Sequence, residues 1–93
     1  MNADWGRLVL VPTPIGNLGD LTHRAEETLR DADIVACEDT RHSGRLLQYY
    51  QIDTRKISLH EHNEAMRSAA LIEEIKQGKT VALISDAGSP TIS

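Results

Sequence analysis

The chain has 93 residues, of which 40% are hydrophobic and 26% are charged, and its formal net charge is −4. These values are typical of one soluble globular domain with a modest core, and they exclude a polycation that binds nucleic acid by overall charge alone. The single cysteine excludes an internal disulfide, and no apolar run approaches the roughly 20 residues of a membrane span. We therefore expect a cytoplasmic protein with no membrane contact.

The first half of the chain predicts a strand, a shaped loop and a helix. Residues 1–7 are polar and are expected to be flexible, whereas 8–11 are all apolar, which is typical of a strand covered on both faces. Prolines and glycines between residues 12 and 19 predict a loop. Thr22 is the expected N-cap of a helix over 22–32. Its expected buried stripe is Leu21, Ala25, Leu29 and Ala32.

The remaining elements repeat this alternation. Strands are predicted at 34–37, at 57–59 as an edge strand, and at 81–84. Thr40 and Asn63 are the expected N-caps of the two intervening helices, and Gly78 is expected to end the second one in the left-handed conformation. Gly44 weakens its helix by about 1 kcal/mol relative to alanine. The expected buried residues are Ser43, Leu46, Leu47 and Tyr50 in the first of these helices, and Ala65, Ala69, Ile72 and Ile75, flanked by Leu71, in the second.

The order βαβαβαβ predicts an α/β fold with an open, mostly parallel sheet and helices on both faces. The carboxyl ends of parallel strands meet at one edge of the sheet. The loops at 12–21, 38–40, 60–63 and 85–93 are therefore expected to lie together and to form a ligand site.

The segment after the second strand is the strongest cluster for catalysis. Glu38, Asp39 and His42 are groups that can orient or deprotonate a hydroxyl, and Arg41 can hold a phosphate, with Arg45 extending the patch. The alternative needs no function, because acidic residues at a helix N-terminus are favoured by the helix dipole.

Two further segments admit more than one interpretation. His60 and His62 share a face, but a third ligand is missing, so we expect no metal and favour a substrate contact or a helix cap. The loop 85–90 contains the small residues Ala87 and Gly88, which let a ligand approach the backbone, or it is an ordinary tight turn.

Three long strings in this chain resemble the ribosomal RNA small-subunit methyltransferase I family, a branch of the tetrapyrrole-methylase superfamily. They are VPTPIGNLGDLT (11–22), CEDTRHSGRLL (37–47) and LISDAGSPTIS (83–93). The resemblance implies an enzyme that uses S-adenosyl-L-methionine to methylate the ribose 2′-hydroxyl of a cytidine in small-subunit (16S) rRNA. The implied partner is the rRNA or the ribosomal subunit.

The resemblance also implies roles for individual residues. Asn17 falls where many tetrapyrrole methylases carry an aspartate, so it is a candidate on the substrate side together with the catalytic candidates Glu38, Asp39 and Arg41. The loss of that carboxylate argues against a tetrapyrrole substrate. The implied cofactor contacts are Pro12, Ala87, Gly88, Ser89, Pro90 and Ile92.

Members of this family continue into a second domain, so residues 8–93 are expected to be the N-terminal α/β domain, inactive alone. The superfamily strand order is 3-2-4-1-5, and the fifth strand is absent here, which makes Leu8–Val11 an open edge and predicts a homodimer. Two alternatives remain. One is a precorrin or uroporphyrinogen methylase domain, and the other is a non-catalytic binding module.

Overall fold

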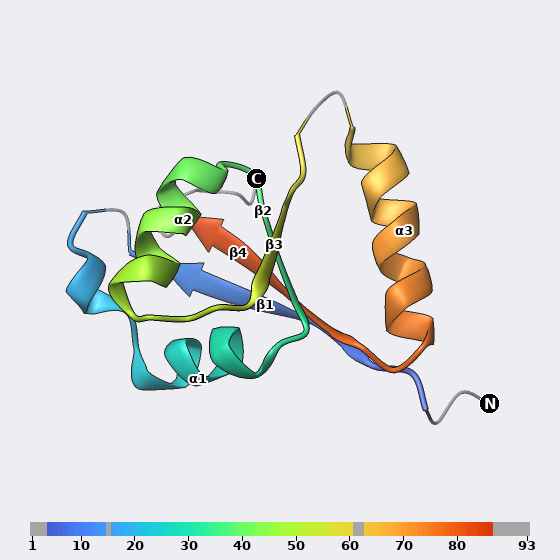
Figure 1. Cartoon of the computed structure of the whole chain (residues 1–93), viewed down its shortest axis with the longest axis horizontal. Helices are drawn as coiled ribbons and strands as arrows, with labels where there is room; N and C mark the ends of the chain where they lie inside the picture. The colour runs from blue at the N-terminus through green and yellow to red at the C-terminus, as the bar shows by residue number, and fades with distance from the viewer. Residues whose placement is uncertain (1–3, 15, 61–62, 87–93) are drawn as a thin grey trace.

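The computed structural model describes residues 4–14, 16–60 and 63–86, which form a sheet with helices on both faces (Figure 1). The strands are β1 (Arg7–Thr13), β2 (Ile34–Cys37), β3 (Arg55–Ser58) and β4 (Thr80–Asp86). They lie in the order β1-β4-β2-β3, and each pair of neighbours is parallel. The predicted α/β fold is confirmed, as is the position of the first strand at an edge.

The helices divide between the two faces. A short 3₁₀ helix, η1 (Leu18–Asp20), precedes α1 (His23–Asp31), and α2 (Thr40–Tyr49) follows β2. Figure 1 shows α1 and α2 together on one side of the sheet and α3 (Glu64–Lys76) on the other. The larger core lies beneath α1 and α2, and the smaller core beneath α3 consists of Ile34, Ala36, Leu71 and Val81.

The start of α1 follows the sequence prediction. The Thr22 side chain accepts a hydrogen bond from the Ala25 N–H at 3.0 Å, so Thr22 is the N-cap. All four residues of the predicted stripe are buried: Leu21, Ala25, Leu29 and Ala32. The cap and the apolar period are local signals, and here they agree with the packing.

The predicted cap of α2 is wrong, and that of α3 is confirmed in position only. Asp39, rather than Thr40, is the N-cap of α2, because the Asp39 carboxylate accepts a hydrogen bond from the Arg41 N–H. Asn63 stands at the N-cap position of α3, but its side chain makes no capping bond. Its Oδ1 instead accepts a hydrogen bond from the His60 N–H at 2.9 Å. Gly78 has φ +96°, as predicted for a left-handed helix end.

The predicted buried face of α3 is also wrong. Leu71 is buried, whereas Ala65, Ala69 and Ile72 are exposed. Successive residues of a helix point in directions about 100° apart, so choosing a stripe one residue away turns the predicted buried side by that angle. The small side chains of the alanines of α3 do little to indicate which side is buried. The larger side chain of Leu71 makes the contact with the sheet, and Ile75 packs beside it.

One face of β1 is open, contrary to the prediction that both faces are covered. Leu8 and Leu10 are 53% and 64% exposed, while Val11 is buried on the opposite face beneath α1. The core beneath α3 contains residues of β2, β3 and β4 but none of β1, so α3 leaves this part of the sheet uncovered.

Within the described residues, no helix is long and apolar enough to cross a membrane.

Candidate functional site

The carboxyl ends of the four parallel strands lie along one edge of the sheet. The register pairs Thr13, the last residue of β1, with Asp86, the last residue of β4. Glu38 and Asp39 follow β2 directly, and His60 lies two residues beyond β3. Within the residues that the structure describes, the ends of the four strands therefore share one edge, as predicted, whereas the loop after β1 leads away, with the Leu18 carbonyl accepting a hydrogen bond from the Tyr50 hydroxyl at 2.7 Å.

Two hollows at this edge share Glu38 and Leu83 in their walls. The first hollow, of about 240 Å³, is lined by Leu10, Glu38, Asp39, Ser43, Leu83, Ile84 and Ser85. The second, of about 560 Å³, is lined by Glu38, Leu59, His60, Glu64 and Leu83. Small-molecule pockets usually measure roughly 300–1,000 Å³. The first hollow therefore has room for only part of a cofactor-sized ligand.

Asp39 combines a structural and an electrostatic role. Its Oδ1 accepts the Arg41 N–H at 2.9 Å and lies 3.4 Å from Arg41 Nε. The backbone hydrogen bond from Arg41 lowers the pKa of the Asp39 carboxyl, and the nearby guanidinium contributes in the same direction. A carboxylate with a lowered pKa is a weak base. Asp39 is thus suited to orient a hydroxyl or attract a positive charge rather than to remove a proton.

Glu38 is placed differently from its neighbour. It lines both hollows, and its carboxylate accepts no hydrogen bond from the residues that the structure describes. A carboxylate that is not committed to a helix cap can accept a proton from a group in either hollow. Of the two acids, Glu38 therefore has the better position for a base.

The other predicted site residues lie apart from these acids. Asn17 lines neither hollow, and its Oδ1 accepts the Gly19 N–H at 2.9 Å, so it caps η1. Pro12 lines a separate hollow of about 230 Å³ between β1 and α1. The structure brings together Glu38, Asp39 and the start of α2, where the Arg41 side chain is exposed.

The expected cofactor contacts at Ala87, Gly88, Ser89, Pro90 and Ile92 lie outside the described residues. His60 is described, and its Nε2 lies 3.1 Å from Asn63 Nδ2. Among the described residues, no three His, Cys, Asp or Glu side chains are grouped as a metal site requires.

Two buried polar atoms near this edge have no hydrogen-bond partner among the described residues: Thr13 Oγ1, at the end of β1, and His42 Nε2, in the first turn of α2. An unpaired buried polar atom is costly and often marks a position that a ligand completes. Sequence reasoning missed Thr13. It predicted correctly that Ser43 is buried, but not that Ser43 stands in the wall of the first hollow. The two prolines that flank Thr13 indicate a loop but do not reveal that the threonine is buried.

The donor set of this edge fits the expected cofactor, S-adenosyl-L-methionine. Glu38 and Asp39 supply negative charge that a sulfonium favours. Ser43 and Ser85 supply hydroxyls that can hydrogen-bond the polar parts of such a ligand. The chemistry of these described residues thus suits part of such a ligand.

Comparison with known proteins gives a consistent set of relatives. Three of them carry the name ribosomal RNA small subunit methyltransferase I. The protein of Synechocystis is 56% identical over 88 residues, that of Bacillus subtilis 53% over 91 residues, and that of Escherichia coli O157:H7 50% over 88 residues. The aligned segments cover 95%, 98% and 95% of this chain but only 32%, 31% and 31% of those relatives. The chain therefore spans about a third of the length of the curated relatives it matches.

The family profile described as Tetrapyrrole (Corrin/Porphyrin) Methylases matches residues 7–93, which includes every strand and helix described above. The observed parallel α/β sheet is consistent with such a domain. The chain belongs to the tetrapyrrole (corrin/porphyrin) methylase family.

Proposed function

We propose that the protein containing this chain methylates the ribose 2′-hydroxyl of a cytidine in small-subunit (16S) rRNA, with S-adenosyl-L-methionine as methyl donor. The relatives named as small-subunit rRNA methyltransferases support the substrate class, since their identity to this chain reaches 56% over 95% of its length. The observation that carries the proposal is the pair of adjacent acids, Glu38 and Asp39, in the wall of a hollow at the carboxyl edge.

The cofactor, when bound, supplies a methyl group on a positively charged sulfur. The negative charges of Glu38 and Asp39 favour that positive charge at the edge of the sheet. Asp39, whose pKa is lowered, accepts a hydrogen bond from the ribose hydroxyl and orients it. Glu38 accepts the proton of the ribose hydroxyl, whose oxygen would receive the methyl group that the bound cofactor supplies. Arg41, with an exposed guanidinium, holds a neighbouring phosphate.

The chain supplies one part of this machinery. We propose that it is inactive alone, because the first hollow measures only about 240 Å³ and the chain covers about a third of its relatives. The exposed Leu8 and Leu10 on an edge strand favour pairing of the 93-residue chain with a second copy, so this chain forms a homodimer.

The test uses the whole protein with methyl-labelled S-adenosyl-L-methionine and small ribosomal subunits. We expect label in the rRNA and recovery of 2′-O-methylcytidine after digestion to nucleosides, with no transfer by the 93-residue chain. Label on a base, or on an added tetrapyrrole with none in the rRNA, would contradict the proposal.

A further inference from the structure

An open groove of about 700 Å³ is lined by residues of α2, of β3 and of the connection between them. Figure 1 shows α2 and β3 as neighbours. The groove begins at Arg41 and reaches the connection between α2 and β3. The residues of its wall that matter here are Arg41, Gly44, Arg45, Gln48, Asp53 and Lys56. Residues 41, 44, 45 and 48 follow the helical spacing and therefore share one side of α2.

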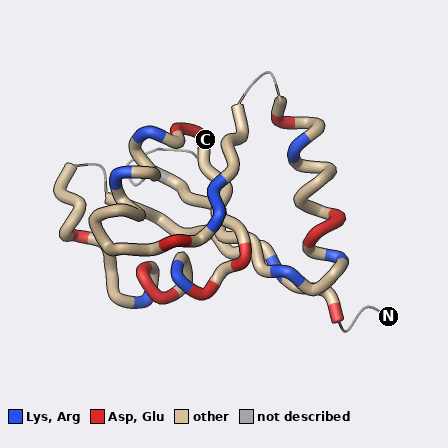
Figure 2. Tube along the Cα trace, in the orientation of Figure 1, with Lys and Arg blue, Asp and Glu red and all other residues tan. Residues whose placement is uncertain are grey.

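The groove concentrates positive charge in an acidic chain. Three cations and a single acid, Asp53, stand in its wall, whereas the whole chain has a net charge of −4. Figure 2 shows Lys and Arg segments on both α2 and β3. Such a local excess of positive charge favours contact with phosphates.

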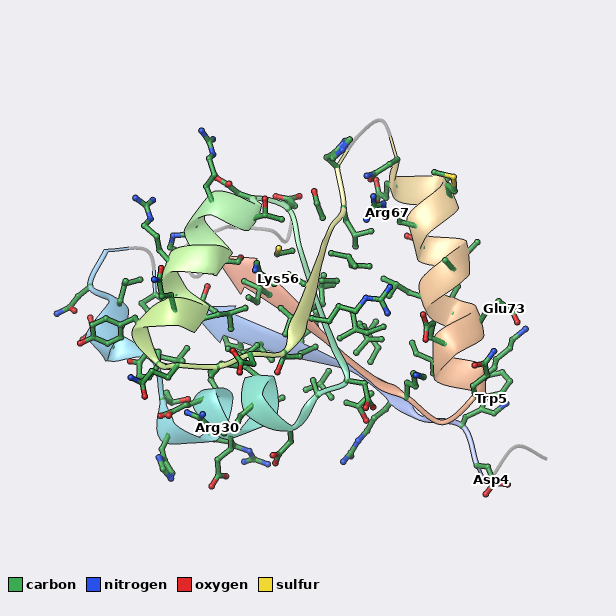
Figure 3. All side chains as sticks on the ribbon, in the orientation of Figure 1. Asp4, Trp5, Arg30, Lys56, Arg67 and Glu73 are labelled. Atoms are coloured by element: carbon green, nitrogen blue, oxygen red, sulfur yellow. The ribbon has the colours of Figure 1, made fainter. Side chains whose placement is uncertain are left out.

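Two of the three cations of the groove, Arg45 and Lys56, are less neutralised than others nearby. Arg30 binds Glu26 at 2.7 Å, and Arg55 lies 3.8 Å from Glu74 on the α3 side of the sheet. Lys56, the next residue of β3, points to the opposite face, toward α2 (Figure 3). Neither Arg45 nor Lys56 forms an ion pair with the residues that the structure describes. Their charges are available to a ligand.

Gly44 lies in the wall between these cations. Among the described residues, a Cβ added there would meet only Lys56 Cε, at 3.8 Å, which is an ordinary van der Waals contact. The fold therefore does not require glycine at this position, although glycine weakens a helix interior. A residue without a side chain lets a ligand approach the backbone closely. Gly44 is thus better explained by a ligand in the groove than by packing within the chain.

The groove is continuous with the candidate catalytic residues. Arg41 stands at its end and contacts Asp39, and Asp39 lines the first hollow. A chain of phosphates that lies along α2 would therefore lead directly to the hollow at the carboxyl edge.

We propose that this groove binds the sugar–phosphate backbone of the rRNA strand beside the methylated nucleotide, with Arg45 and Lys56 on its phosphates and Gly44 at the point of closest approach. This inference rests on the function proposed above and adds the path of the substrate. The contacts position the strand and carry no base sequence.

The test measures the affinity of the whole protein for small-subunit rRNA as a function of salt. Removal of one phosphate contact lowers the salt slope by about 0.7–0.9 and the affinity by roughly three- to sixfold at 0.15 M salt. We expect this loss for Arg45→Gln and for Lys56→Gln, with cofactor affinity unchanged. Arg55→Gln is the matched control, because Arg55 adjoins Lys56 but faces α3, and we expect its salt slope to equal that of the wild type.

Gly44→Ala gives an independent readout. We expect a higher midpoint of thermal unfolding, since alanine favours the helix, together with weaker RNA binding. The proposal that the groove binds RNA would be overturned if Arg45→Gln and Lys56→Gln kept the RNA affinity and salt slope of the wild type. An equal loss of RNA affinity in Arg55→Gln would also overturn it. If the wild-type protein methylates rRNA while these variants bind RNA normally, only the proposal about the groove is refuted. If the wild-type protein transfers no methyl group to rRNA, the proposed function fails.

Discussion

Replacement of Thr13 by valine tests whether its buried hydroxyl is unpaired. Thr13 is 1% exposed, and its Oγ1 has no hydrogen-bond partner among the described residues. A buried polar group without a partner costs about 1–3 kcal/mol. Valine keeps the shape of threonine, removes the hydroxyl and favours a strand. We therefore expect Thr13→Val to raise the free energy of unfolding by about 1–2 kcal/mol.

The assay is urea and thermal unfolding of the 93-residue chain, followed by circular dichroism. For a domain of this size, 1 kcal/mol corresponds to a shift of roughly 4–8 °C in the unfolding midpoint. Thr54→Val is the matched control, because Thr54 Oγ1 donates a hydrogen bond to the Leu29 carbonyl at 2.8 Å. That variant should lose about 1 kcal/mol. Loss of stability in Thr13→Val as large as in Thr54→Val would refute the reasoning.

Three further predictions concern a carboxylate, an apolar face and a cap. The lowered pKa of Asp39 contributes stability that is present when the pH is above the usual carboxyl pKa of about 3.9 and is lost as the pH falls through the pKa of the folded state. The free energies of unfolding of the wild type and of Asp39→Asn should therefore converge in acid. A constant difference between them down to pH 2 would contradict this. The double variant Leu8→Lys, Leu10→Lys should abolish self-association in analytical ultracentrifugation at a cost below about 1 kcal/mol, since both side chains are mostly exposed; a wild-type chain that sediments as a monomer at high concentration would oppose it. Thr22→Ala should lower the free energy of unfolding by about 0.5–2 kcal/mol, measured in urea, because α1 loses its N-cap hydrogen bond; an unchanged urea midpoint would show that the bond contributes nothing.

The parts of the fold that depend on local chemistry could be predicted from the sequence. Thr22 caps α1 as expected, and Gly78 takes the left-handed conformation at the end of α3. The alternation of apolar runs with helical stripes indicated a parallel sheet, and this sheet brings Glu38 and Asp39 to a shared edge. These signals act over a few residues, so they survive without knowledge of the tertiary packing.

The predictions from sequence are wrong where the local structure depends on packing against a neighbouring helix or strand. Asp39 and Thr40 are both good caps, and only the actual turn after β2 selects Asp39. The face of α3 depends on which strands it covers, so an alanine-rich pattern did not identify Leu71 as its buried residue. Likewise, four apolar residues indicate a strand but do not show whether a helix covers both of its faces, as Leu10 demonstrates.

The candidate site shows the same division. The acids after β2 were predictable as a cluster, but the sequence does not reveal that their hydrogen bonding differs and that, of the two, only Asp39 is engaged in a cap. Asn17 was placed with them by resemblance, whereas the structure shows it capping η1, outside both hollows. The position of Lys56 in the wall of the groove depends on the alternation of side chains along β3 and on the approach of Lys56 to Gly44. Both are properties of the folded chain.

The central claim, that the acids at the carboxyl edge perform the methyl transfer, is tested most directly by the single-turnover rate of Glu38→Gln in the whole protein. Glu73→Gln is the control, since Glu73 lies on α3 and pairs with Lys76 at 3.6 Å. We predict that Glu38→Gln lowers the rate of methyl transfer to small-subunit rRNA by roughly 10²–10⁴-fold, with RNA and cofactor affinities unchanged. A rate within twofold of wild type would contradict the claim.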